Sequence, residues 1–317
     1  MAGGTGPGAC RAGSAAVPGR AGATVNAPRP GRAGGVRERS VRAAAAHVYV
    51  TDLEAPALGD DDRHHLLRVL RLRPGEPVSA ADGEGGWLPC RLTGEGELEP
   101  AGPPARAPRP DPLITIALAV PKGDRAEWAV QKLTEVGADR IIPLVADRSV
   151  VRWPADRAGR QVERWRAIAR AAAMQSRRLW LPQVEAPRTT RQLLAAAASA
   201  GGRPALPERA GHQRAQGTPA GGSAEPGGGA TGAVAGAGVA LAEPGGEAPG
   251  LSRPTVVIGP EGGWTEEELE AAPATVALGP SILRTETAAV VAATLLAALR
   301  SGLVGQVATP PGAITPR

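Results

Sequence analysis

The sequence is poor in aromatic residues and in cysteine. Its 317 residues include no phenylalanine, one tyrosine, six tryptophans and two cysteines. Cys10 and Cys90 are far apart and form no C-x-x-C pair. Such usage favours neither a disulfide framework nor a zinc site, and it is typical of a reducing compartment. We therefore expect no metal and a cytoplasmic location.

Long apolar runs are also missing. The longest, residues 288–299, spans twelve positions and is interrupted by Thr294, whereas a membrane-spanning helix needs about 20 apolar residues. The N-terminus lacks the apolar core of a secretory signal. The sequence therefore predicts no association with a membrane.

The net charge of +5 is unevenly distributed. Residues 1–46 hold seven arginines against Glu38 alone, so the rest of the chain is close to neutral and overall basicity is poor support for RNA binding. A second basic stretch is more informative. Residues 152–178 hold eight arginines against two acidic residues in a sequence of helical character, and such a helix can follow the phosphates of an RNA.

Glycine (43 residues) and proline (32 residues) are abundant and concentrated in segments without periodicity. These segments predict a disordered basic extension over 1–45, a disordered insertion over 199–237, a disordered tail over 304–317 and a proline-rich linker over 101–112. Short strands around a short helix at 62–70 are predicted within 46–100. Alternating strands and helices predict an α/β domain with a parallel sheet over 113–303.

One pattern in this last domain occurs twice. Short β-type runs at 255–258 and 275–278 are each followed by Gly-Pro and then by a helical sequence. The first loop contains Gly259, Gly262 and Gly263, which let the main chain approach a ligand closely. Thr265 and Glu268 have the spacing of a capping box, which predicts that a helix begins there. Ligands bind beyond the carboxyl ends of parallel strands, so we expect a site at these loops.

Four strings carry a resemblance to a known family. They are KGDRAEWAVQKLTEVGA (122–138), AMQSRR (173–178), IGPEGGWTEEEL (258–269) and LGPSILRTETAA (278–289). In this order they resemble the RsmE family of SPOUT enzymes, which methylate N3 of a uridine in 16S rRNA with S-adenosyl-L-methionine. The resemblance covers roughly residues 46–197 and 238–303. Met174 departs from it, because an acidic residue is expected before Gln175.

The resemblance implies a SPOUT-type parallel sheet with a C-terminal trefoil knot, preceded by a small PUA-like β-barrel that binds RNA. It implies S-adenosyl-L-methionine as cofactor, the small ribosomal subunit as partner, and a homodimer. The residues expected to line the cofactor slot are Leu241, Gly259, Glu261, Gly262, Gly263, Leu278, Gly279, Ile282, Leu283 and Thr287.

Uridine N3 carries a proton, so methylation requires a base or a cation that stabilises the uracil anion. Arg284 is the expected stabiliser, and Glu286 or Glu261 is the expected base, although a carboxylate in a first helical turn is often only a dipole partner. The residues expected to bind RNA are His65, Arg68, Arg71, Lys122, Arg125, Arg177 and Arg178.

Three alternatives stay open or are disfavoured by the sequence. A SPOUT enzyme acting on another RNA, such as tRNA, is one, although the PUA-like domain and the string HHLLRVLRLRPGE (64–76) argue against it. A non-catalytic RNA-binding assembly factor that retains the pocket is another. A dinucleotide enzyme is disfavoured, because no G-x-G-x-x-G follows a predicted strand.

Overall fold

The computed structural model describes residues 41–151, 153–200 and 238–305. The predicted extension, insertion and tail lie almost entirely outside these ranges. Residues 41–45 are an exception: they fall in the predicted extension, yet Val41 is buried and packs with Tyr49 and Trp87. Val41 therefore belongs to the packed structure, which composition did not indicate, because its side chain finds an apolar partner surface.

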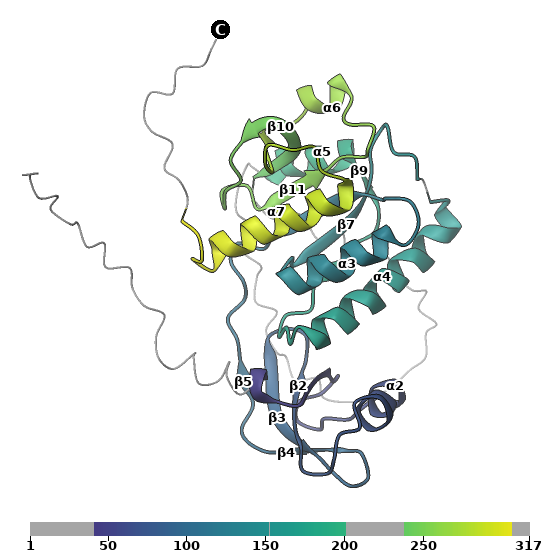
Figure 1. The fold of residues 1–317 in the computed structure, drawn as a ribbon, viewed down its shortest axis with the longest axis vertical. Coiled ribbons are helices and arrows are strands. Elements are labelled where there is room, and N and C mark those ends of the chain that lie inside the picture. Colours follow the sequence, from purple (N-terminus) through teal and green to yellow (C-terminus); the bar gives the residue numbers. More distant parts are fainter. Residues whose placement is uncertain (1–40, 152, 201–237, 306–317) are drawn as a thin grey trace, which may run out of the picture.

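A small mixed sheet forms one end of the molecule (Figure 1). Its strands are β1 (Ala46–Tyr49), β2 (Pro77–Ala81), β3 (Gly86–Leu92), β4 (Leu98–Pro100) and β5 (Ala105–Arg106). Their order is β1-β2-β3-β4, with β5 also paired to β3. β5 lies inside the segment predicted as a linker, so that segment takes part in the sheet.

A helical crossover joins β1 to its parallel neighbour β2. It consists of α2 (Asp60–His64) and a π-helical turn, η1 (His65–Val69). The predicted helix at 62–70 is confirmed, but its second half is wider than an α-helix. Leu66 is its one fully buried residue and fills the core between β1, β2 and β3.

The second sheet is parallel and larger. Its strands are β6 (Thr115–Ala119), β7 (Arg140–Val145), β8 (Gln183–Val184), β9 (Arg188–Thr189), β10 (Val239–Glu247), β11 (Thr255–Ile258) and β12 (Thr275–Val276). The order is β12-β10-β11-β6-β7-β8, with β9 also on β7. All of these pairings are parallel, which confirms the predicted sheet.

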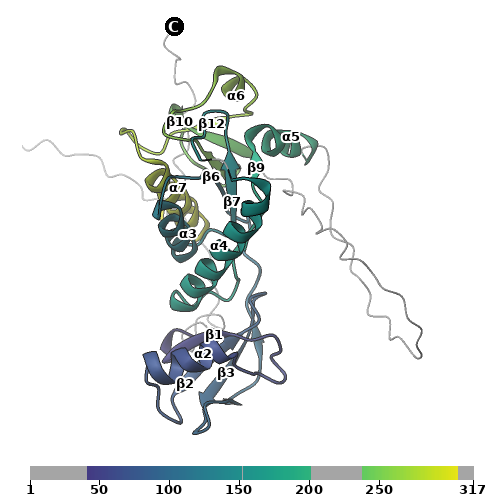
Figure 2. The ribbon, with the colours of Figure 1, turned by 90° about the vertical axis from the view of Figure 1, so that its right-hand side faces the viewer.

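Helices cover both faces of this sheet (Figures 1 and 2). α3 (Arg125–Val136), α4 (Ala155–Gln175) and α7 (Thr285–Arg300) pack on one face. α5 (Thr190–Ala200) and α6 (Glu266–Glu270) lie on the other side. Burial on both faces explains the continuous apolar strands: Ile116 and Leu118 face the first layer, and Ala117 faces the second.

The last turns of α4 and the residues just after it connect the two sheets. The carbonyl of Arg178 accepts hydrogen bonds from His47 Nε2 (3.0 Å) and Tyr49 Oη (2.6 Å) of β1. On α4 itself, Arg170 pairs with Asp62 of α2 at 2.6 Å. The relative position of the two sheets is therefore fixed by several directional contacts.

Candidate functional site

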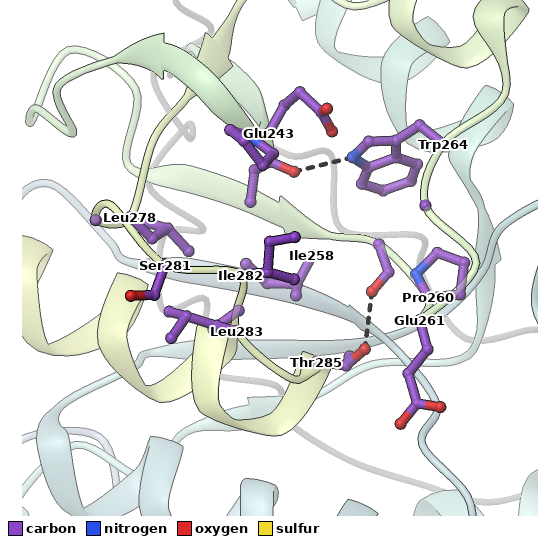
Figure 3. Close-up of a pocket in the computed structure, with 16 residues that line it drawn as sticks. Glu243, Ile258, Pro260, Glu261, Trp264, Leu278, Ser281, Ile282, Leu283 and Thr285 are labelled. Atoms are coloured by element: carbon purple, nitrogen blue, oxygen red, sulfur yellow. Dashed lines mark hydrogen bonds between the residues drawn. The ribbon is translucent and has the colours of Figure 1, made fainter.

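A cavity of about 260 Å³ lies at the carboxyl end of β11, beside the middle of β10 (Figure 3). We call it the first cavity. Its walls come from the end of β11 and the residues after it, from the middle of β10, and from the loop and first turn that begin α7. The two Gly-Pro loops thus meet at one end of the sheet, as their sequence pattern predicted.

The first loop is shaped by Trp264. Its indole Nε1 donates to the carbonyl of Ala242 at 2.9 Å (Figure 3), which fixes the ring beside the middle of β10. A Cβ on Gly259 would lie only 2.9 Å from this ring. Glycine at this position therefore lets the main chain pass against the tryptophan.

Three more contacts hold the loop. Thr285 Oγ1 at the start of α7 donates to the carbonyl of Gly259 at 3.0 Å (Figure 3). The predicted capping box of Thr265 and Glu268 is present. Glu268 is buried and also accepts from the main chain of Asp147 at 3.2 Å. The loop is consequently fixed to β10, to α7 and to the segment after β7.

A second cavity, of about 530 Å³, adjoins the first. It is lined by Arg125, Glu261, Ile282, Leu283 and Arg284, and three of these, Glu261, Ile282 and Leu283, also line the first cavity. Two ligands could therefore lie next to each other across this shared wall. Ile282 is 92% exposed, so an apolar side chain extends into solvent between the two cavities.

Arg125 connects two carboxylates at the second cavity. Its Nη1 lies 3.0 Å from Glu261 Oε1 and 3.5 Å from Glu286 Oε1. The hydrogen bond that Arg125 donates to Glu261, followed by the charge of Glu286, raises the pKa of Arg125. The two acids differ in access: the side chain of Glu261 is 62% exposed and that of Glu286 only 8%. Glu286 Oε2 is buried and has no hydrogen-bond partner within the described part of the chain.

Comparison with known proteins agrees with this arrangement. An RNA methyltransferase domain family matches residues 108–220 and 242–297, and an RNA methyltransferase PUA domain family matches residues 58–99. The ribosomal RNA small subunit methyltransferase E of Mycobacterium tuberculosis is 34% identical over 254 residues, which are 76% of this chain and 86% of the relative. Its counterpart from Bacillus subtilis is 32% identical over 74% of this chain and 87% of its own length.

This chain belongs to the RsmE family. A solved structure of the Neisseria gonorrhoeae RsmE, bound to S-adenosyl methionine, matches with a TM-score of 0.59 and 27% identity, covering 81% of this chain and 97% of that one. A probable rRNA methyltransferase from Porphyromonas gingivalis matches with a TM-score of 0.60 and 25% identity, over 82% of this chain and all of that one.

Of the ten residues predicted to bind the RsmE cofactor, seven line the first cavity. They are Gly259, Glu261, Gly263, Leu278, Gly279, Ile282 and Leu283. The other three lie outside it. Leu241 is fully buried and faces the α5 and α6 side of the sheet, whereas its neighbour Ala242 reaches the cavity. Gly262 and Thr287 are exposed, and neither lines the cavity.

Other residues line the first cavity that were not predicted from the sequence, chiefly Ala242, Trp264 and Thr285. Ala242 follows Leu241 on a strand, so a one-residue error exchanges the two faces of the sheet. Thr285 differs from Thr287 by two positions on a helix, which turns the side chain to another side. The two-residue period of a strand and the 3.6-residue period of a helix would have identified Ala242 and Thr285.

The residues predicted to bind RNA fall into two groups. His65, Arg68 and Arg71 are exposed on η1 or just after it, and Lys122 is exposed in the loop before α3. Arg125 lines the second cavity but is committed to two carboxylates.

Arg177 and Arg178 follow the end of α4, and both are partly buried against the rest of the fold. Arg177 donates to the main chain of Val41 and Arg42. Arg178 has a side chain only 12% exposed, which pairs with Asp139 at 2.9 Å and donates to the carbonyl of Thr134. Burial lowers the pKa of Arg178. The guanidinium of Arg178 therefore has partners within the fold, and its contact with RNA stays a prediction.

No helix among the described residues is long and apolar enough to span a membrane. No group of three or more His, Cys, Asp and Glu side chains in residues 41–151, 153–200 and 238–305 is arranged to hold a metal ion. Lys132 and Glu135 of α3 pair with each other at 2.8 Å, and Glu135 therefore has a local partner.

Proposed function

We propose that this RsmE-family chain transfers a methyl group from S-adenosyl-L-methionine to N3 of a uridine in 16S rRNA of the small ribosomal subunit, in the cytoplasm. The shared wall between the first and second cavities carries the proposal, because it allows a methyl donor and a methyl acceptor to lie side by side. Proximity and alignment of two bound reactants supply much of the acceleration of such a transfer.

The first cavity fits the cofactor in its chemistry. Ile258, Leu278 and Leu283 offer apolar surface to an adenine ring, while the loops at 259–263 and 278–283 offer main-chain donors and acceptors. The tight approach of Gly259 to Trp264 keeps this slot free of additional side-chain atoms. When bound, S-adenosyl-L-methionine supplies an electrophilic methyl group.

The second cavity suits the base that accepts the methyl group. Arg284 lines it, is exposed, and has no side-chain hydrogen bond or ion pair within the described residues. A free guanidinium at this place can stabilise the negative charge that develops on the uracil ring as N3 loses its proton. The base must first leave its stack, at a cost of a few kcal/mol.

Removal of the N3 proton needs an accessible acceptor. Glu261 lines both cavities, whereas Glu286 lines neither. We therefore assign Glu261 as the proton acceptor. Glu286 serves as a fixed charge that, together with Glu261, orients Arg125. The sequence left Glu261 and Glu286 as alternative bases, and this assignment selects Glu261.

The rest of the chain would position the RNA. We assign residues 46–100 as the PUA-like RNA-binding domain, with His65, Arg68 and Arg71 as contacts, and residues 113–303 as the knotted SPOUT domain, where Lys122 adds a further contact. A homodimer is part of the proposal. Trp128 of α3 supports it, because this large apolar side chain is 45% exposed.

The test uses purified protein, labelled S-adenosyl-L-methionine and small subunits that lack the modification. We expect 3-methyluridine in the digested 16S rRNA, and a loss of at least about a hundredfold in kcat/KM for Arg284→Ala with unchanged cofactor affinity. Cofactor binding without transfer to small subunits, but with transfer to tRNA, would contradict the proposed substrate. Absence of cofactor binding would contradict the enzyme itself.

A further inference from the structure

A third cavity, of about 420 Å³, lies at the same edge of the sheet as the first two. Val120 and Pro121, which directly follow β6, line it, and so do Val150 and Val151, which follow β7. Asp124 lines the third cavity while the next residue, Arg125, lines the second. The two cavities are therefore neighbours around the start of α3.

The third cavity presents apolar surface of a kind that takes a flat ring. Trp153 and Trp165 line it, and their rings pack edge to face with centroids 5.4 Å apart. Trp165 is fully buried and anchors the pair, whereas Trp153 is only partly buried. Val150 also lines the cavity and is 70% exposed. Nucleobases stack readily on such aromatic and apolar side chains.

Polar groups of the cavity are available for binding. Asp124, Arg157 and Gln161 line it, and their side chains form no hydrogen bond or ion pair within residues 41–151, 153–200 and 238–305. A carboxylate and an amide can read the edge of a base, and a guanidinium can bind a phosphate. By contrast, Glu127 and Arg164 in the same wall neutralise each other at 2.6 Å.

The main chain adds to the preference for a phosphate. α3 and α4 both begin at this cavity, since their N-cap residues Asp124 and Pro154 line it, and neither helix start has a side-chain cap. Uncapped N–H groups at a helix start favour an anion. Here they line the same cavity as Arg157 and the partly buried indole of Trp153, so one site combines an anion-binding part and a stacking part.

We propose that the third cavity binds a nucleotide of the substrate RNA that flanks the target uridine, with its base against Trp153 and its phosphate at Arg157. The assignment rests on the proposed function, because it takes the RNA in the second cavity to continue around the start of α3. It makes the third cavity a specificity site for the sequence or shape next to the target.

The first experiment compares Arg157→Ala with Arg191→Ala. Arg191 is a matched control: it is exposed on α5, lies outside the third cavity, and its loss changes the net charge equally. Methylation of unmodified small subunits is measured at several subunit concentrations. For Arg157→Ala we expect a KM for subunits raised about tenfold, an unchanged cofactor Kd, and a kcat within about twofold. Equal effects in both variants would overturn the site in favour of general charge attraction.

The second experiment locates the contact directly. The full chain is cross-linked by ultraviolet light to small subunits, and the attached peptides are identified by mass spectrometry. We expect rRNA nucleotides on the peptide that contains Trp153 and Gln161, and loss of this cross-link in Trp153→Leu but not in Trp153→Phe, which keeps a stacking ring. A cross-link from this peptide to a ribosomal protein, or no cross-link, would overturn the proposal.

The two experiments separate this proposal from the proposed function. Transfer of methyl groups with no effect of Arg157→Ala and no rRNA cross-link would remove the flanking site and leave the enzyme intact. An rRNA cross-link at Trp153 with no methyl transfer to small subunits would retain the site and remove the proposed reaction.

Discussion

Arg178 and Asp139 form an ion pair at 2.9 Å whose side chains are 12% and 6% exposed. Asp139 also accepts from the main chain of Ile114 at 2.9 Å and pairs with Arg300 of α7. The same Arg178 offers its carbonyl to His47 and Tyr49 of the small sheet. This ion pair thus joins the residue before β6, the helix α7 and the other sheet.

Replacing Arg178 with alanine should therefore lower stability. Removal of one partner leaves a buried carboxylate with less compensation, which costs about 3 kcal/mol in the free energy of unfolding. Denaturant unfolding measures it. The exposed Arg68→Ala is the control, and we expect its stability to be unchanged. If Arg178→Ala instead kept full stability and lost RNA affinity, the role expected from the sequence would be right after all.

His47 should make stability depend on pH. Its Nε2 donates to the Arg178 carbonyl and its Nδ1 accepts from Ser79 Oγ at 2.7 Å, so the neutral ring satisfies both partners. Burial lowers the pKa of His47 from 6.5 to about 4. Because the unfolded state binds the proton more readily, stability is full above pH 6.5 and is lost as the pH falls toward 4, by up to about 3 kcal/mol.

The measurement is the free energy of unfolding between pH 7 and pH 4.5 for the parent chain and for His47→Gln. We expect the variant to lose the part of the slope that lies between about pH 5 and 6.5, where carboxylates contribute little. An unchanged slope in His47→Gln would assign the dependence to other groups.

Gly259→Ala should damage the first cavity. The new methyl group would lie 2.9 Å from the ring of Trp264, so either the ring or the loop must move. We expect the Kd for S-adenosyl-L-methionine, measured by calorimetry, to rise roughly tenfold to a hundredfold. Gly262→Ala, in the same loop, is the control, because its Cβ would meet Arg148 only at an ordinary 3.5 Å. Equal effects of both changes would indicate a general loss of loop flexibility.

The two carboxylates beside Arg125 should differ in effect. Glu261→Gln removes the proposed proton acceptor, and we expect kcat to fall about a hundredfold with little change in stability. Glu286→Gln removes a buried charge that lines neither cavity, and its loss of activity should be smaller. Single-turnover methylation at saturating cofactor measures the chemical step. A larger loss in Glu286→Gln would reverse the assignment.

Much of the architecture follows from local pattern. The apolar run at 255–258 predicted β11 at its observed limits, since strands buried on both faces carry little else. The capping box at Thr265 was also readable, because it is a local hydrogen-bonding requirement.

What the sequence by itself determined was therefore the order of the elements, the parallel sheet and the two Gly-Pro loops. Only the tertiary structure decided which partners the charged residues contact. Arg178 looked like an RNA ligand, yet Asp139, 39 positions away in the chain, pairs with it. Likewise Arg125, Glu261 and Glu286 lie far apart in sequence and meet only where β6 and β11 are neighbours. Periodicity reports burial within one element, whereas the partner of a charge depends on which elements the fold brings together.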